Sequence, residues 1–536
     1  MRVALAQINL LVGDVSGNTD KLIAAANDAK AKGAHVVVYP ELAVTGYPPE
    51  DLLLRPALME QVEAALHRLR REVAGITLVV GHPWREDARL FNAVSAIRDG
   101  QVLGRYYKQA LPNYGVFDEM RYFTPGEGAT VVEVEGVKLG LTICEDIWQS
   151  GPVEQSVAAG AELVLNINAS PYHYSKRPER ETVVAREASA NKVPVVYVNL
   201  VGGQDELVFD GNSLVMDAEG KLAHRAPEFR ESLTVVEFKR EDGAMKPSAS
   251  EIFPALAHEE GVYQAIVTGV RDYVEKAHFP GVVLGLSGGI DSALCLAVAV
   301  DALGADRVEA VMMPSRYTSD MSVQDAQKMA DILGIQYHVI PIEPMFRAFT
   351  DSLAETFAGK PADTTEENIQ ARCRGIILMA ISNKSGKMVL TTGNKSEMAV
   401  GYATLYGDMA GGFAAIKDVP KTLVFRLSEY RNTISRVIPQ RIIDRPPSAE
   451  LAPDQVDEDS LPPYEVLDPI LEMFIEKDMS PKEIVARGYD EETVRRVTRM
   501  VLINEYKRRQ APPGVRITSR AFGRDRRYPI ISGYRE

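Results

Sequence analysis

The chain has 536 residues, of which 46% are hydrophobic and 25% are charged, which is the composition of a globular protein. A chain of this length is too long for one hydrophobic core, so two or three domains are expected. A formal net charge of −14 argues against a protein that binds nucleic acids or anionic membranes over its whole surface. Three cysteines without paired spacing exclude a disulfide framework and a cysteine zinc site, and they indicate a reducing compartment.

The first fourteen residues, MRVALAQINLLVGD, alternate between apolar and polar positions and include Gln7 and Asn9. This pattern predicts a first β-strand and not a signal peptide. No uninterrupted apolar segment approaches the length needed to cross a membrane. We therefore expect a soluble cytoplasmic protein whose partners include neither a membrane nor a nucleic acid.

Strand-like and helix-like segments alternate through residues 1–238, which predicts an α/β domain. Three reactive side chains follow strand-like segments: Glu41 in HVVVYPE, Lys108 in GRYYKQALPN and Cys144 in LTICEDIW. Ligands of α/β proteins bind at the carboxyl ends of strands. Taken singly, a solvated Glu or Lys or a buried structural Cys is the more common situation, so the interpretation depends on all three occurring together.

Together, in context and order, these residues resemble the Glu–Lys–Cys triad of the nitrilase superfamily. The resemblance implies an α-β-β-α sandwich and an amide hydrolase: Cys144 is the nucleophile, Glu41 is the base and Lys108 stabilises the thiolate and the oxyanion. Glu119 is implied as a second carboxylate near the nucleophile. The glutamine-dependent members of the superfamily imply a subsite for the α-amino acid end of glutamine, formed by Tyr114, Ser170 and Lys176.

Residues 239–250, KREDGAMKPSAS, lack apolar periodicity and are expected to form an interdomain linker. After them, residues 261–279 predict a helix, and strand–helix units resume over the rest of the chain. A second α/β domain with a parallel sheet is therefore expected over residues 251–536.

Within this domain the apolar strand that begins at Val282 runs into the loop 287–292, SGGIDS, and then into an apolar helix. Gly288 and Gly289 permit a tight turn that presents backbone N–H groups to an anion at the helix N-terminus. The loop has no Walker lysine and resembles the SGGxDS loop of ATP pyrophosphatases, which cleave ATP to AMP and pyrophosphate. The expected ATP-binding residues of this strand and loop are Gly285, Leu286, Ser287, Gly288, Gly289, Ile290, Asp291 and Ser292, and Thr392, in the later TTGN segment, is added to them by resemblance alone.

A domain that releases ammonia joined to one that adenylates a carboxylate makes a glutamine amidotransferase. Nearly the whole chain resembles the glutamine-dependent NAD synthetase family. The resemblance implies a carbon–nitrogen ligase in which ATP adenylates the nicotinate carboxylate of deamido-NAD, and ammonia from L-glutamine displaces AMP to give NAD. A homo-oligomer is also implied.

Further positions are assigned by this resemblance alone. Asn368, Glu397 and Lys507 are implied to bind deamido-NAD, and Asp291 and Glu397 are candidate ligands of the Mg²⁺ that accompanies ATP. A solvated face and a role near pyrophosphate are both compatible with the other basic residues of 507–527. Residues 439–463, rich in Pro and Asp, are equally compatible with a lid and with a disordered loop.

The alternative enzyme is another glutamine amidotransferase of the ATP-pyrophosphatase type with a different acceptor. An asparagine synthetase is disfavoured because position 2 is Arg2 and not cysteine, and a GMP synthetase because Cys144 lies in Ile-Cys-Glu-Asp and not in a glycine-flanked elbow. A nucleotide-binding scaffold without chemistry is disfavoured because it needs no nucleophilic cysteine.

Overall fold

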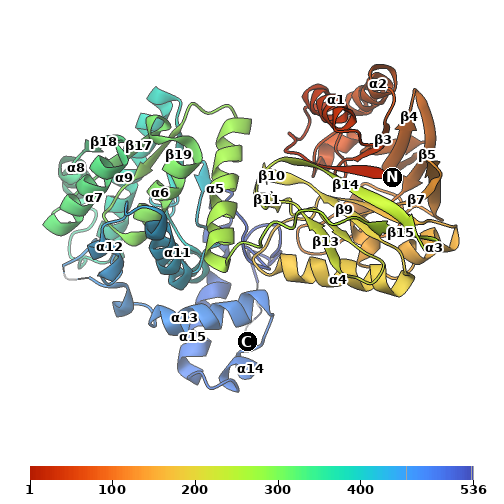
Figure 1. The fold of residues 1–536 in the computed structure, drawn as a ribbon. Helices are drawn as coiled ribbons and strands as arrows, with labels where there is room; N and C mark the ends of the chain where they lie inside the picture. The colour runs from red at the N-terminus through yellow and green to blue at the C-terminus, as the bar shows by residue number, and fades with distance from the viewer. Residues whose placement is uncertain (454, 533, 535–536) are drawn as a thin grey trace. The chain divides into compact units, whose positions relative to one another are not determined.

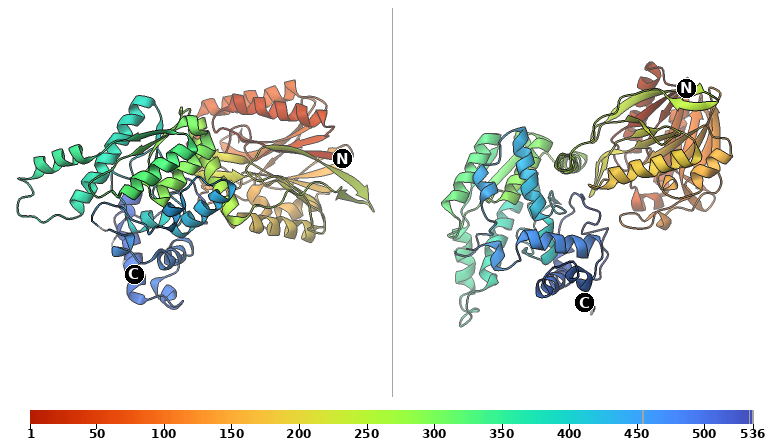
Figure 2. Two further views of the ribbon diagram at one scale, coloured as in Figure 1. Left: turned by 60° about the vertical axis from the view of Figure 1, so that its left-hand side comes forward. Right: turned by 60° about the horizontal axis from the view of Figure 1, so that its bottom comes forward.

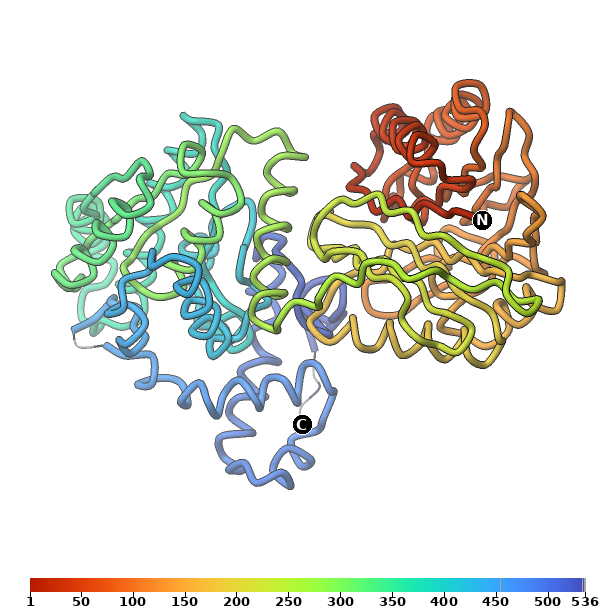
Figure 3. The backbone as a smooth tube through the Cα atoms, in the orientation of Figure 1, coloured from red at the N-terminus to blue at the C-terminus, as the bar shows by residue number. Residues whose placement is uncertain are grey.

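The computed structural model describes residues 1–453, 455–532 and 534, and the chain forms two compact units, Met1–Ala257 and His258–Glu536 (Figure 1). The path of the chain through each unit can be followed in Figure 3. Among the described residues, no helix combines the length and apolar character needed to cross a membrane.

The first unit contains two large β-sheets and one two-stranded sheet, β10 (Val201–Gln204) with β11 (Leu207–Asp210). The seven-stranded sheet has the order β15-β14-β1-β2-β3-β4-β5 and the six-stranded sheet the order β13-β12-β9-β8-β7-β6. The strands of the first are β1 (Arg2–Gln7), β2 (Val36–Val38), β3 (Thr77–Glu86), β4 (Arg89–Arg98), β5 (Gln101–Tyr107), β14 (Ser232–Glu241) and β15 (Ala244–Pro247). Those of the second are β6 (Thr130–Val134), β7 (Val137–Ile143), β8 (Leu163–Asn168), β9 (Val195–Asn199), β12 (Leu214–Met216) and β13 (Leu222–Arg225).

The two sheets pack face to face between two layers of helices. Side chains such as Val3 and Leu139 from the facing strands fill the space between the sheets. Helices α1 (Val15–Ala31) and α2 (Pro56–Glu72) cover the outer face of one sheet, and α3 (Pro152–Ala158) and α4 (Lys176–Asn191) cover that of the other (Figures 1 and 2). Alternate residues of β1 face the two layers, so the strand is apolar on both faces. The α-β-β-α sandwich expected from the sequence is confirmed.

The segment 239–250 differs from the expected linker. Its first part completes β14, and β15 pairs with β14 antiparallel in register from Phe238↔Pro247 to Glu241↔Ala244. The division between the units follows Ala257 instead. Because β15 is an edge strand, only Met245 of its side chains is buried, and the apolar periodicity that identifies a strand is missing.

The second unit is built on a five-stranded parallel sheet of order β18-β17-β16-β19-β20. Its strands are β16 (Val282–Gly285), β17 (Val308–Met312), β18 (Gln336–Val339), β19 (Met388–Thr391) and β20 (Phe413–Ala414). Its main helices are α5 (His258–Lys276), α6 (Ile290–Leu303), α7 (Asp320–Leu333), α8 (Glu343–Leu353), α9 (Thr364–Ser385), α11 (Lys421–Ile434) and α12 (Gln440–Asp444). Helices α8 and α9 pack on the sheet through Phe346 and Ile369, and α6 packs against α5 and α11.

The strand order makes a switch point at the central strand. From β16 the chain builds outward through β17 and β18, and it then returns to the other side of β16 to form β19 and β20. The loops that leave β16 and β19 therefore diverge at one sheet edge, which is where open α/β sheets bind ligands.

A small helical cluster adjoins this sheet within the same unit (Figure 1). It consists of α10 (Lys395–Val400), α13 (Tyr464–Leu471), α14 (Pro481–Val485), α15 (Glu491–Ile503) and α16 (Glu505–Arg508). The segment after α16 returns to the sheet, where Gly514 forms a parallel bridge with Ala414, the last residue of β20. The Asp418 carboxylate accepts hydrogen bonds from the backbone N–H groups of Ile517 and Thr518, at 2.8 and 2.7 Å.

Candidate functional sites

The candidate nucleophile lies at the carboxyl end of β7. Strand β7 ends at Ile143, and Cys144 begins a short 3₁₀ helix, Cys144–Ile147, with a positive φ of 43°. A non-glycine residue in this region is strained and persists only where its surroundings hold it. The side chain is buried in the core between the sheets.

A buried ammonium lies between two buried carboxylates beside this turn. Lys108 follows β5, and its Nζ donates to Glu41 Oε1 at 2.7 Å and to both oxygens of Glu119 at 2.9 Å. Glu41 also accepts hydrogen bonds from Asn92 Nδ2 at 2.8 Å and from the backbone N–H of Ala169 at 3.1 Å. Glu41 and Lys108 are fully buried, so the ion pairs are shielded from water.

The electrostatics leave the thiol protonated until a base removes its proton. Burial and the nearby Glu41 raise the pKa of Cys144 well above its usual value, while Lys108 acts to lower it. Burial alone would lower the pKa of Lys108, but Glu119 and Glu41 outweigh it and raise that pKa. Burial raises the pKa of Glu119 to about 7 despite Lys108. Glu41, which contacts the ammonium, also acts on the pKa of the Cys144 thiol, so its charge lies within electrostatic reach of the sulfur.

The three expected glutamine-binding residues occupy different surroundings. The Tyr114 side chain is largely exposed, and its hydroxyl donates to Glu145 at 3.0 Å. The ammonium of Lys176, at the start of α4, lies 3.7 Å from the ring centre of Trp148. The Cys144 thiolate acts on the pKa of both Tyr114 and Lys176, so both lie within electrostatic reach of it.

Ser170 is buried, and its backbone N–H donates to Asn199 Oδ1 at 2.9 Å. Glu145, Trp148 and Asn199, which support the three residues, were not identified from the sequence. Glu145 follows Cys144 directly and Trp148 ends the same LTICEDIW segment, so the motif itself contains that signal.

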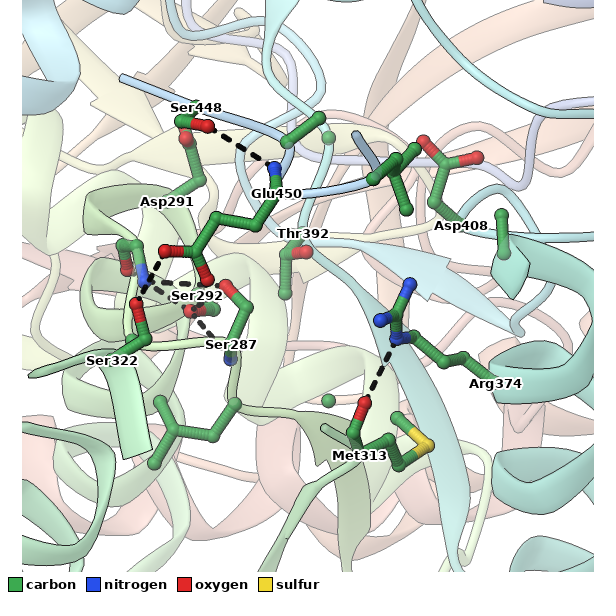
Figure 4. A pocket seen from close by; sticks show the side chains of 18 of the residues that line it. Ser287, Asp291, Ser292, Met313, Ser322, Arg374, Thr392, Asp408, Ser448 and Glu450 are labelled. Carbon is green, nitrogen blue, oxygen red and sulfur yellow. Dashed lines mark hydrogen bonds between the residues drawn. The ribbon is translucent and has the colours of Figure 1, made fainter. Parts of the chain in front are cut away.

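The second unit contains a cavity of about 270 Å³ at the switch point of its sheet (Figure 4). All the expected ATP-binding residues, from Gly285 to Ser292 and Thr392, line this cavity. Figure 4 shows Ser287, Ser292 and Ser322 gathered on one side of the cavity and Arg374 on the other.

The SGGIDS loop holds itself in an open turn. Ser287 and Ser292 hydroxyls lie 3.1 Å apart, and the N–H of Gly289 donates to Ser287 Oγ at 3.2 Å. Gly288 has a φ of 82°, and a Cβ there would lie 2.5 Å from the carbonyl oxygen of Ser322. Only glycine fits at position 288.

The two carboxylates expected to bind metal meet at the same ammonium. Lys421 Nζ, at the start of α11, donates to Asp291 Oδ2 at 2.5 Å and to Glu397 Oε1 at 3.2 Å. Asn394 Nδ2 donates to the other oxygen of Asp291 at 2.8 Å. Burial raises the pKa of Glu397 in spite of Lys421. Among the described residues, no group of three or more His, Cys, Asp or Glu side chains is arranged to hold a metal ion.

Asn368 and Lys507 are not among the residues that line the cavity. Asn368 Oδ1 accepts a hydrogen bond from Thr404 Oγ1 at 2.7 Å. Lys507 Nζ donates to the carbonyl oxygens of Gly401 and Ala403, at 2.8 and 2.9 Å. Thr404 does line the cavity, so both residues support the segment 401–404 that forms part of its wall.

Two further groups line the cavity: Arg374, which the sequence did not identify, and part of the segment 439–463, for which the sequence allowed either a lid or a disordered loop. Arg374, on α9, points its guanidinium into the cavity, and its Nε donates to the carbonyl oxygen of Met313 at 3.0 Å (Figure 4). Residues 445–451 cover another part of the wall, where Glu450 Oε1 accepts from Ser319 and Ser322 hydroxyls at 2.9 Å. This part of the segment 439–463 is therefore hydrogen-bonded onto the cavity.

Basic residues near the end of the chain are paired with internal carboxylates. Arg508 and Arg526 both contact Glu505, at 2.9 and 3.0 Å, and Arg516 contacts Asp525 at 2.6 Å. All three guanidinium groups are buried. These contacts support a structural role for this group of arginines.

Comparison with known proteins agrees with the two units. The carbon-nitrogen hydrolase family matches residues 2–245, and the NAD synthase family matches residues 262–511. A glutamine-dependent NAD(+) synthetase of Acinetobacter baylyi is 50% identical over 100% of this chain and 99% of its own length. The chain belongs to the glutamine-dependent NAD(+) synthetases.

Other members are similar over the same extent. The synthetase of Thermotoga maritima is 45% identical over 100% of this chain and 99% of its own. The solved structure of the Acinetobacter baumannii synthetase in complex with ADP has a TM-score of 0.81 and 49% identity, covering 99% of this chain and 98% of that one. A Cytophaga hutchinsonii synthetase with 24% identity has the same fold, with a TM-score of 0.85.

Proposed function

We propose that this chain makes NAD from deamido-NAD, with ATP as the activating substrate and L-glutamine as the nitrogen donor. The observation that carries the proposal is the presence, in one chain, of a buried Lys108–Glu41 pair beside Cys144 and of an SGGIDS loop that lines a cavity at a sheet switch point. The first arrangement suits amide hydrolysis, and the second suits adenylation.

In the first unit, Glu41 accepts the Cys144 proton and the thiolate attacks the carboxamide carbon of glutamine. Lys108 stabilises the oxyanion of the tetrahedral intermediate, a contribution of roughly 3–4 kcal/mol for one such donor. Collapse breaks the C–N bond, Glu41 returns its proton to the departing ammonia, and a thioester remains on Cys144. Glu41 then takes a proton from water, whose oxygen attacks the thioester carbon; the C–S bond breaks, glutamate leaves, and Glu41 returns the proton to the Cys144 sulfur.

In the second unit, the nicotinate carboxylate of deamido-NAD attacks the α-phosphorus of ATP, and pyrophosphate leaves. The backbone N–H groups and hydroxyls of the SGGIDS loop, at the N-terminus of α6, hold the phosphates. Arg374 supplies a further positive charge to the cavity, where a guanidinium can form paired hydrogen bonds with an anionic oxygen pair. Ammonia attacks the acyl carbon of the adenylate, and AMP leaves.

Asp291 and Glu397 fit a divalent cation, because both are oxygen donors beside the phosphate loop and line the same cavity. These two carboxylates would hold the Mg²⁺, which would supply positive charge beside the phosphates. Lys421 keeps the two carboxylates close together and balances their charge.

Deamido-NAD as the acceptor is supported by the segments that hold Asn368, Glu397 and Lys507, and by the family to which the chain belongs. Tyr114, Ser170 and Lys176 are proposed to hold the α-amino acid end of glutamine. A homo-oligomer in the cytoplasm completes the proposal, and light scattering after size-exclusion chromatography measures its mass.

Chromatography of a reaction mixture tests the proposal as a whole. Purified protein with ATP, Mg²⁺, deamido-NAD and either glutamine or ammonium should produce NAD, AMP and pyrophosphate. Xanthosine monophosphate and aspartate are the competing acceptors. Turnover of either competitor with none of deamido-NAD would refute the acceptor assignment and leave a different amidotransferase.

A further inference from the structure

Besides Glu41 and Glu119, the 3₁₀ helix that begins at Cys144 contains a buried carboxylate that takes no part in the chemistry described above. Asp146, two residues after Cys144, is fully buried and accepts four hydrogen bonds. Its Oδ1 accepts from the backbone N–H groups of Gln109 at 3.1 Å and Ala110 at 2.9 Å. Its Oδ2 accepts from the backbone N–H of Ile143 and from the Tyr106 hydroxyl, both at 2.9 Å.

These four donors belong to the two segments that carry the reacting groups. Tyr106, Gln109 and Ala110 flank Lys108 on both sides, and Ile143 immediately precedes Cys144. The bond to Ile143 closes the turn in which Cys144 has its positive φ. One rigid carboxylate therefore joins the Lys108 segment to the strained Cys144 turn.

We propose that Asp146 is a positioning residue for glutamine hydrolysis that fixes the distance between the Lys108 ammonium and the Cys144 sulfur. This inference rests on the glutaminase role of Cys144 proposed above. Lys108 is one of the two charges that act most strongly on the Cys144 thiol, and the only one of them that favours the thiolate. A looser Lys108 segment stabilises the thiolate and the oxyanion less, even if the fold remains intact.

The Asp146→Asn variant cannot keep the hydrogen bonds to both segments, although the side-chain volume barely changes. An asparagine has one acceptor oxygen, so its NH₂ group must face either the N–H of Ile143 or the N–H groups of Gln109 and Ala110. Two donors then face each other, and one segment loses its anchor.

The measured quantities are kcat/KM for glutamine and the pH dependence of alkylation at Cys144. We expect kcat/KM to fall on the order of 100-fold, as for a displacement of about 1 Å. The apparent pKa of Cys144 alkylation by iodoacetamide, followed by peptide mass spectrometry, should rise by about one unit. NAD synthesis from ammonium should stay within about twofold of wild type, because the second unit is unchanged.

The alkylation profile separates positioning from simple structural support. A residue that only supports the fold lowers the amount of folded protein but leaves the thiol pKa of the folded fraction unchanged. Asp217→Asn is the matched control, because Asp217 also accepts two backbone N–H bonds, from Glu219 and Lys221, in the remote β12–β13 hairpin. It should leave both quantities within about twofold of wild type.

Tyr106→Phe is the second variant and removes one of the four donors. We expect a loss of about fivefold in kcat/KM, equivalent to one ordinary hydrogen bond. If Asp146→Asn does not fold, Tyr106→Phe decides, and wild-type kinetics in it overturns the proposal. A folded Asp146→Asn protein with unchanged kcat/KM and thiol pKa overturns it as well. Glutamine hydrolysis that persists in Cys144→Ala would instead refute the glutaminase assignment.

Discussion

Lys507→Met removes an ammonium that holds the wall of the cavity in the second unit, while keeping much of the apolar side chain. Lys507 Nζ donates to the carbonyl oxygens of Gly401 and Ala403, at 2.8 and 2.9 Å. A hydrogen bond from a charged group contributes roughly 1.5–3 kcal/mol, and solvent screening at this half-buried side chain reduces it to about 1 kcal/mol each. The loss of both, about 2 kcal/mol, corresponds to roughly a 30-fold lower kcat/KM for deamido-NAD.

The assay is steady-state NAD synthesis with ammonium as the nitrogen donor and with deamido-NAD varied at saturating ATP. Glutamine hydrolysis without deamido-NAD should be unchanged, because Lys507 belongs to the other unit. Lys387→Met is the matched control: Lys387 Nζ contacts Glu309 at 2.9 Å, just before β19 at the amino end of the sheet. If Lys507→Met and Lys387→Met have the same kcat/KM as wild type, the reasoning about the segment 401–404 is wrong.

Four further outcomes are expected. Cys144→Ala should lose glutamine-dependent synthesis and keep synthesis from ammonium, and near-normal use of glutamine would contradict the nucleophile assignment. Chromatography should show AMP and pyrophosphate as the ATP products, and ADP with phosphate would exclude the ATP-pyrophosphatase interpretation. Asp291→Asn should raise the Mg²⁺ concentration for half-maximal synthesis at least about tenfold, and an unchanged Mg²⁺ titration would remove Asp291 from the proposed metal site. Burial lowers the pKa of His82 to about 3, so the unfolded chain binds a proton at this residue below about pH 6.5 that the folded chain does not bind; between pH 7 and pH 5 the His82 share of the unfolding free energy should fall by about 2 kcal/mol, which urea unfolding measures as the difference in pH dependence between wild type and His82→Gln, and the same pH dependence in both would refute the attribution.

The residues that the sequence identified in the first unit are those that directly follow buried strands. Glu41, Lys108 and Cys144 follow β2, β5 and β7, so each could be picked out from its own strand; β7 belongs to the other sheet, and that the three residues meet is information the sequence alone does not carry. The structure has Lys108 and Glu41 in contact and their charges acting on Cys144. The SGGIDS loop was recognisable for the same reason, because glycines and hydroxyls between an apolar strand and an apolar helix have few other uses.

Other parts of the sites depend on contacts between segments far apart in the sequence. Lys421 and Asp291, 130 residues apart, form a contact that no local pattern indicates. Arg374 lies in a helix without a motif for the cavity it lines, and Asp146 looks like any polar residue that follows a strand. The strand β15 was missed because only one of its side chains is buried. Apolar periodicity reports burial within one segment, and it carries no information about which remote segment a polar side chain meets.

The bridge between Gly514 and Ala414 has a consequence for how the protein is made. The bridge to the last strand of the second unit cannot form until Gly514 has been synthesised, whereas every strand of the first unit precedes Ala257. At roughly 5–20 residues per second, the residues from His258 to Gly514 take roughly 13–51 s to translate. A nascent chain in that interval has every strand of the unit that holds Cys144 and lacks a contact of the unit that holds the SGGIDS loop.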